Sequence, residues 1–190
     1  NPGGFEVDEI VEKIMTDFGG INLYFSFDLS GSMRDPDAAS GRSKADVQRD
    51  VALLFIDSLM QCAYMARQAG EESDLLPLKL MVTLASDRGD VKLRLTDKWS
   101  PKEQWAFYAA LTQLATGGTP THQTLKLIER DFDKEQTELK AKNISPEKLP
   151  IQYTAEISDG APDDFAATEQ MHQVLKSKGM VVRSYPIGQA

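Results

Sequence analysis

The sequence predicts a three-layer α/β domain of the doubly wound, Rossmann-like class, in which helices cover both faces of a mostly parallel sheet with one antiparallel edge strand. Two observations favour this fold class. Apolar runs of strand length alternate with segments of helical period, which is typical of parallel sheets. Two of the runs are joined by a short polar connection, which is typical of a hairpin. The length of 190 residues, with 41% hydrophobic and 26% charged residues, fits one globular domain.

Apolar runs predict the strands of the sheet. They cover residues 21–27, 77–86, 91–95, 151–158 and 180–187. Five of the seven residues of the first run are apolar, as in a strand that is covered on both faces. The second and third flank Asp87-Arg88-Gly89-Asp90, whose polar residues and glycine indicate a turn between antiparallel strands. The last two runs each end in residues typical of turns.

Helical periodicity predicts a long helix over 46–69. Its apolar stripe has spacings of three and four, so we expect this face to lie on the sheet. The stripe consists of Val47, Val51, Leu54, Phe55, Ser58, Leu59, Cys62 and Met65. Cys62 lies within it and is expected to be an inert core thiol.

Three further helices are predicted after the hairpin, and one before the first strand. Residues 105–114 follow Ser100-Pro101-Lys102-Glu103, which has the pattern of a capping box. Residues 121–142 have an apolar face only in their first half, so we expect the charged second half to project into solvent. Residues 163–178 are expected to pack through Phe165, Met171, Val174 and Leu175, and to end at Gly179. Residues 5–18 form a short amphipathic pattern with Phe5, Ile10, Val11, Ile14 and Met15.

Composition excludes several classes of function. The formal net charge of -8 disfavours binding to nucleic acid or to anionic membrane surfaces. The single cysteine, Cys62, excludes an internal disulfide and a thiolate metal cluster, which suits a reducing compartment. No apolar run approaches the roughly 20 residues that span a bilayer, and the first residues lack the pattern of a signal peptide. We therefore expect a soluble, cytoplasmic protein.

Three polar segments are expected at the carboxyl edge of the sheet, where α/β sheets bind ligands. The first and third follow predicted strands, and the second precedes a predicted helix. They are Asp28-Leu29-Ser30-Gly31-Ser32-Met33, Gly117-Gly118-Thr119-Pro120-Thr121 and Ser158-Asp159-Gly160. Carboxylates and hydroxyls without histidine or thiolate are the ligands of a hard divalent cation. Two carboxylates with neutral hydroxyls favour Mg²⁺, with Mn²⁺ or Ca²⁺ as alternatives.

At these residues the chain resembles the von Willebrand factor A (vWA) domain and its metal-ion-dependent adhesion site (MIDAS). The match consists of Asp28, Ser30 and Ser32 in a DxSxS motif, Thr119 in GGTPT and Asp159 in SDG. Thr121 competes with Thr119, which we favour because it directly follows the two glycines. The order of strands and helices over residues 21–188 also follows the family, in the manner of its bacterial and archaeal intracellular members.

The resemblance implies that Ser30 and Ser32 bind the metal directly, whereas Asp28 binds mainly through water. It implies that Thr119 binds directly in the ligand-bound state, and that Asp159 alternates between direct and water-mediated contact. The family continues with a sixth strand and a closing helix, for which no residues remain after 190. We therefore divide the chain into a helical extension, 1–20, which packs on the domain, and a vWA-like domain, 21–190, without those two elements and with its affinity switch in doubt.

The function predicted from these residues is a metal-dependent protein-interaction module, not an enzyme. Its Mg²⁺ would bind a glutamate or aspartate of a partner protein. An alternative is a non-catalytic docking subunit of a MoxR-type AAA+ ATPase or metal-chelatase assembly. A third hypothesis, an enzyme with Ser30 or Ser32 as nucleophile, needs a positioned base, and the sequence does not indicate one.

Overall fold

The computed structural model describes residues 19–68 and 77–187 and contains one five-stranded sheet in the order β3-β2-β1-β4-β5. β1, β2, β4 and β5 run parallel, and the edge strand β3 pairs antiparallel with β2. The strands are β1 (Ile21–Asp28), β2 (Leu78–Ala85), β3 (Gly89–Thr96), β4 (Ile151–Ser158) and β5 (Val181–Pro186). The predicted fold class and the five strands are confirmed.

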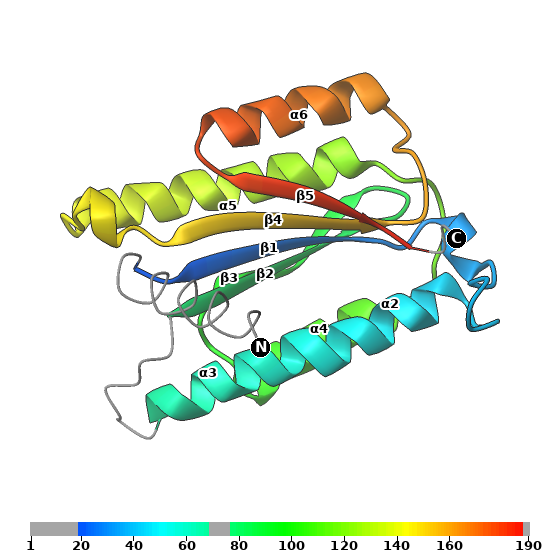
Figure 1. The fold of residues 1–190 in the computed structure, drawn as a ribbon, viewed down its shortest axis with the longest axis horizontal. Helices are drawn as coiled ribbons and strands as arrows, with labels where there is room; N and C mark the ends of the chain where they lie inside the picture. The colour runs from blue at the N-terminus through cyan, green and yellow to red at the C-terminus, as the bar shows by residue number, and fades with distance from the viewer. Residues whose placement is uncertain (1–18, 69–76, 188–190) are drawn as a thin grey trace, which may run out of the picture.

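Helices cover both faces of the sheet (Figure 1). On one face lie α5 (Thr121–Ala141) and α6 (Phe165–Ser177). On the other lies a continuous helical segment of α2 (Lys44–Ala52), a π-helical turn η2 (Leu53–Asp57) and α3 (Ser58–Gln68), next to α4 (Pro101–Leu111). Two short 3₁₀ turns, η1 (Gly31–Arg34) and η3 (Pro146–Lys148), lie in the connections.

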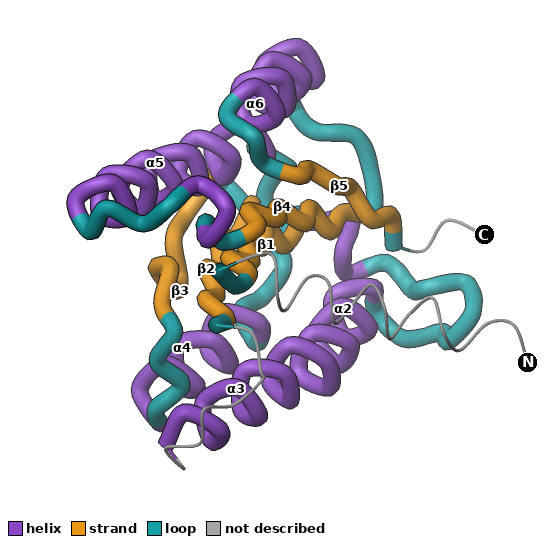
Figure 2. The backbone as a smooth tube through the Cα atoms, turned by 60° about the vertical axis from the view of Figure 1, so that its left-hand side comes forward, coloured by secondary structure: helices purple, strands orange, loops and turns teal. Residues whose placement is uncertain are grey.

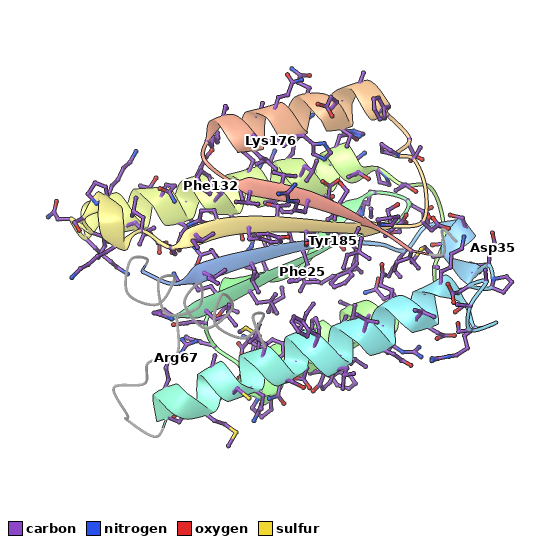
Figure 3. The ribbon with its side chains drawn as sticks, in the orientation of Figure 1. Phe25, Asp35, Arg67, Phe132, Lys176 and Tyr185 are labelled. Carbon is purple, nitrogen blue, oxygen red and sulfur yellow. The ribbon has the colours of Figure 1, made fainter. Side chains whose placement is uncertain are left out.

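Each layer between the sheet and its helices has its own apolar core. The core beneath α2, α3 and α4 is centred on Phe27, Leu80, Trp99 and Phe107, all fully buried. The other core includes Tyr24 and Met81 of the sheet with Leu125, Ile128 and Phe132 of α5. Figure 3 labels Phe25 and Phe132, which lie on opposite sides of the sheet.

The predicted apolar stripe of the long helix is not its buried face. The residues that are buried are Gln48, Ala52, Ile56, Met60 and Ala63. Of the predicted stripe, Val51 and Phe55 are 61% and 70% exposed, and Cys62 is exposed instead of being a core thiol. The reason is that this helix is apolar on two adjacent faces, and the face with Ala52, Ile56, Met60 and Ala63 packs on the sheet.

Three other helix predictions need correction. The second half of α5 does not simply project into solvent, because the buried Glu135 carboxylate binds Lys79 of β2 at 2.6 Å. Phe165, expected to pack, is exposed in the first turn of α6. α4 begins after Ser100 as predicted, but the hydroxyl of Ser100 bonds the Glu103 carboxylate and no backbone amide.

The predicted N-terminal helix, 5–18, lies outside the described residues. None of the helices within 19–68 and 77–187 is both long enough and apolar enough to cross a membrane.

Candidate metal centre

The candidate site lies at the carboxyl edge of the sheet, where β1 and β4 end and α2 and α5 begin (Figure 1). Asp28, the last residue of β1, is 2% exposed. Its Oδ1 accepts a hydrogen bond from the backbone N–H of Ser30 at 2.7 Å, and its Oδ2 accepts one from the Ser158 hydroxyl at 2.6 Å. Because both oxygens are held, the Asp28 carboxylate has one fixed orientation in the loop.

The two serines and the second aspartate of the predicted set are brought together. The hydroxyl oxygens of Ser30 and Ser32 are 3.1 Å apart. The Ser32 hydroxyl donates to Oδ1 of Asp159 at 2.9 Å. Asp28, Ser30, Ser32 and Asp159 thus form a connected set, although Asp159 is 127 residues from Ser32 in the sequence.

Thr119 is a buried residue of a loop that is joined to the DxSxS segment by backbone hydrogen bonds. The N–H of Gly31 donates to the carbonyl of Gly117 at 3.0 Å, and the N–H of Thr116 donates to the carbonyl of Leu29 at 2.7 Å. Gly117 has a φ of +74°, a conformation that favours glycine. The carbonyl of Thr119 accepts from two backbone amides, whereas no hydrogen bond within the described residues involves its hydroxyl. The fold therefore places Thr119 in the loop beside the serines but shows no direct bond to them.

Two residues that the sequence analysis missed support the site from α2. Lys44, the first residue of α2, places its Nζ 2.7 Å from Oδ2 of Asp159, and the two side chains are 15% and 3% exposed. The hydrogen bond to Asp159 raises the pKa of Lys44. The buried Gln48 amide donates to the carbonyl oxygen of Asp28 at 2.9 Å. A lysine and a glutamine in a helical segment carry no local motif, so no sequence signal identified them.

The donor set fits a hard divalent cation. Within the described ranges, no three His, Cys, Asp or Glu side chains are grouped in a way that could hold a metal, so hydroxyl oxygens would have to contribute. The Ser32 hydroxyl lies at hydrogen-bond distance from both the Asp159 carboxylate and the Ser30 hydroxyl, so these oxygens could turn lone pairs toward a shared cation. Two carboxylates, hydroxyls and water are suitable ligands for Mg²⁺ or Mn²⁺.

A cavity of about 290 Å³ lies directly beside this site, between β4, β5 and α6. In its wall, Nε2 of His172 is 2.6 Å from Oε1 of the buried Glu156. The hydrogen bond to Glu156 raises the pKa of His172, and this effect exceeds the opposing effect of burial. The pair ties α6 to β4 two residues before Ser158.

No family model matches the sequence, and no curated protein matches it. Solved structures do match it. An aerotolerance-related membrane protein from Bacteroides fragilis has a TM-score of 0.57 and 15% identity, over 88% of this chain and 68% of that chain. The manganese-loaded TRAP protein from Plasmodium vivax has a TM-score of 0.55 and 18% identity, over 90% and 59%. Proximal thread matrix protein 1 from the mussel byssus, with a zinc-occupied MIDAS motif, has a TM-score of 0.53 and 15% identity, over 87% and 35%.

These similar proteins contain vWA domains. The chain spans about two thirds of the Bacteroides protein and a smaller share of the other two. Sequence identities of 15–18% establish the fold alone. The chain therefore has the vWA fold, with the segments of the predicted metal site at the carboxyl edge of its sheet.

Proposed function

We propose that this chain, which has the vWA fold, is a metal-dependent protein-interaction module. Ser30 and Ser32 would bind Mg²⁺ directly, Asp28 and Asp159 would complete the set directly or through water, and Thr119 would join when a partner is bound. The observation that carries the proposal is the convergence of two serine hydroxyls and the Asp159 carboxylate beside a fixed Asp28.

The chemistry of this donor set explains why the site would bind a partner. Neutral hydroxyl ligands leave much of the charge of a divalent cation uncompensated, so a position on the ion would attract a carboxylate. The chain itself has a net charge of -8, which repels an acidic partner at long range. Recognition of a glutamate or aspartate would thus depend on the metal and weaken when it is removed.

The solved structures support a divalent ion in this fold, since one is manganese-loaded and another has a zinc-occupied MIDAS motif. An enzymatic role for Ser30 or Ser32 has less support. Among the described residues the two hydroxyls bond to each other, that of Ser32 also bonds to Asp159, and neither bonds to a histidine that could act as a base.

The narrower form of the proposal concerns the partner and the compartment. We expect a cytoplasmic partner in a MoxR-type AAA+ ATPase or metal-chelatase assembly, where this chain would dock and perform no chemistry. The single cysteine is compatible with a reducing compartment. Co-purification of such an ATPase with the wild-type chain and Mg²⁺, and its loss on Asp28→Ala, would support this form. Equal recovery with both chains would exclude it.

Thermal denaturation with and without Mg²⁺ tests the metal site. At about 100 times its dissociation constant, a bound ion adds about 2.7 kcal/mol of stability. For a domain of this size that raises the Tm by roughly 5–11 °C. Asp28→Ala should abolish the increase, whereas Asp131→Ala, which removes a buried aspartate paired with Arg94 away from the site, should retain it. An unchanged Tm of the wild-type chain in millimolar Mg²⁺ and Mn²⁺ would overturn the proposal.

A further inference from the structure

The cavity of about 290 Å³ beside the candidate metal centre has a polar floor. Ser26, Glu156 and Ser184 form one row across this floor, because the sheet pairs Ser26 with Glu156 and Glu156 with Ser184. Helix α6 lies over β4 and β5 (Figure 2) and adds Thr168 and His172 to the lining. Pockets for drug-sized ligands have about 300–1,000 Å³, so this cavity suits a single side chain better than a large ligand.

One oxygen of the Glu156 carboxylate has no hydrogen bond within the described ranges. Glu156 is 6% exposed. Its Oε1 lies 2.6 Å from Nε2 of His172 and 3.4 Å from the hydroxyl of Ser184. Its Oε2 takes part in no hydrogen bond with any described residue. Because Glu156 lines the cavity, Oε2 is an acceptor that a bound hydrogen-bond donor could use.

A second polar group of the cavity lining also lacks a partner. Thr168 is 4% exposed, and its buried hydroxyl has no hydrogen-bond partner among the described residues. A threonine inside a helix can donate its hydroxyl hydrogen to the carbonyl one turn earlier, and Thr168 does not do so. Buried polar groups without partners destabilise a fold. Glu156 and Thr168 line the same cavity, so one polar ligand could satisfy both.

The charges of the lining favour a cation over an anion. The lining includes the carboxylates of Asp28, Glu156 and Glu169, and no lysine or arginine is among the described residues that form it. The imidazole of His172 already lies between two glutamates, since its Nδ1 is 3.5 Å from Oε2 of Glu169. It therefore has no ring nitrogen left for an anion. A charged donor also forms stronger hydrogen bonds to a carboxylate than a neutral donor does.

We propose, building on the proposed function, that this cavity binds an arginine or lysine side chain that the partner protein carries close to its metal-binding carboxylate. The cationic group would donate to Oε2 of Glu156 and to the hydroxyl of Thr168. Its methylene stem would lie on exposed and half-buried apolar residues of the lining, as such stems commonly do. These residues are Ala161, Pro162, Phe165 and Pro186. A basic residue would also offset the repulsion between an acidic partner and a chain with a net charge of -8.

The cavity is near enough to the metal centre for one short segment to reach both. Ser158 lines the cavity, and its hydroxyl bonds Oδ2 of Asp28 at 2.6 Å. Glu156 precedes Ser158 by two residues on the same face of β4, a separation of about 7 Å along the strand. Residues i and i+2 of an extended peptide have the same separation and point to the same side. The expected partner motif therefore has one residue between the acidic and the basic residue.

Nuclear magnetic resonance of the two histidines tests the cavity without metal. His172 lines the cavity and reports on it, whereas His122 is not among the described lining residues and is the internal control. In EDTA at constant pH, butylguanidinium and butylammonium should shift the ring nitrogens of His172 until saturation. Butylurea, a neutral isostere, should bind about fivefold more weakly or worse, and butyrate should not bind. Equal binding of butylurea, tighter binding of butyrate or the lack of a saturable response would overturn the proposal.

Variants of the cavity assign the binding groups. Glu156→Gln should weaken butylguanidinium binding by about tenfold or more. Thr168→Val removes a hydroxyl without a partner and should weaken it about threefold, which provides an independent test if Glu156→Gln does not fold. The matched control is Glu135→Gln, which changes another buried carboxylate, paired with Lys79, and should bind the probe like the wild-type chain. Unchanged binding by both cavity variants would refute the proposal.

Capped glycine pentapeptides with glutamate at position 2 test the motif in the presence of Mg²⁺. Position 4 is arginine, lysine or glutamine. The better of the two basic peptides should bind about fivefold more tightly than the glutamine peptide and thereby identifies the cationic group, and all three should bind alike to Glu156→Gln. Equal binding of the three peptides to the wild-type chain would overturn the cavity proposal and leave the metal site standing. A preference for the basic peptides that persists without Mg²⁺ would support the cavity and refute the metal-dependent function.

Discussion

Removal of the Lys44 ammonium is expected to strengthen metal binding. Nζ of Lys44 lies 2.7 Å from Oδ2 of Asp159, while the other oxygen of Asp159 accepts from Ser32. A cation that recruits Asp159 must therefore compete with a tethered positive charge. In Lys44→Met the helix retains a side chain of similar length, and the carboxylate is free for the metal.

The size of the effect follows from a thermodynamic cycle. Loss of one partner costs about 3–5 kcal/mol in a fully buried ion pair and at most about 1 kcal/mol in an exposed one. With side chains 15% and 3% exposed, the Lys44–Asp159 pair lies between these limits. We take about 2 kcal/mol, which lowers the Tm of the metal-free variant by roughly 4–8 °C. If Mg²⁺ then compensates Asp159 in place of Lys44, the same 2 kcal/mol appears as a roughly 30-fold increase in affinity.

Titration calorimetry with Mg²⁺, together with melting curves at zero and saturating Mg²⁺, measures both quantities. Lys79→Met is the matched control, because Lys79 pairs with the buried Glu135 at 2.6 Å near the opposite end of the strands. The control should lose the same stability with and without Mg²⁺ and bind the ion as the wild-type chain does. Unchanged or weaker Mg²⁺ binding by Lys44→Met would refute the reasoning.

Three other predictions concern the surroundings of the site. The pKa of His172 is raised by Glu156, so this pair stabilises the fold fully below pH about 6.5, and its contribution is lost as the pH rises through the raised pKa. Chemical denaturation across pH 5–9 should show this decline in stability, and Glu156→Gln should abolish the decline. Gly117→Ala should destabilise the fold by about 1–3 kcal/mol in the same assay, because φ is +74° and a Cβ would lie 2.1 Å from a carboxylate oxygen. Ser158→Ala removes a 2.6 Å hydrogen bond to Asp28 and should weaken Mg²⁺ binding by about tenfold or more in calorimetry. An unchanged affinity would show that Asp28 does not need this hydrogen bond to bind the ion.

The strands and the carboxyl-edge loops could be predicted from the sequence because their signals are local. β1 has five apolar residues out of eight and ends directly at Asp28, so both its burial and the site at its end are visible in this short segment. The hairpin between β2 and β3 is likewise signalled by its own turn. The convergence of Ser32 and Asp159 could be expected because parallel strands end at one edge.

The faces of the helices could not be assigned in the same way. The long helix from Lys44 to Gln68 has two apolar faces, and periodicity alone favoured the one with Val51, Phe55 and Leu59. Close packing on the sheet selected the face with Ala52 and Ala63 instead. Lys44 and Glu135 were missed for a related reason, since the burial of a charged side chain depends on a partner that is distant in sequence.

Two main-chain hydrogen bonds join the DxSxS loop to the Thr119 loop. Gly31 bonds to Gly117 and Thr116 bonds to Leu29 through amide and carbonyl groups, so apart from the glycine that the φ of +74° favours at position 117 these bonds require no particular side chain. Exposed side chains around the site can therefore vary over evolution while the two loops stay in register. A descendant protein could change its choice of acidic ligand at this rim without having to rebuild the ion-binding arrangement beneath it.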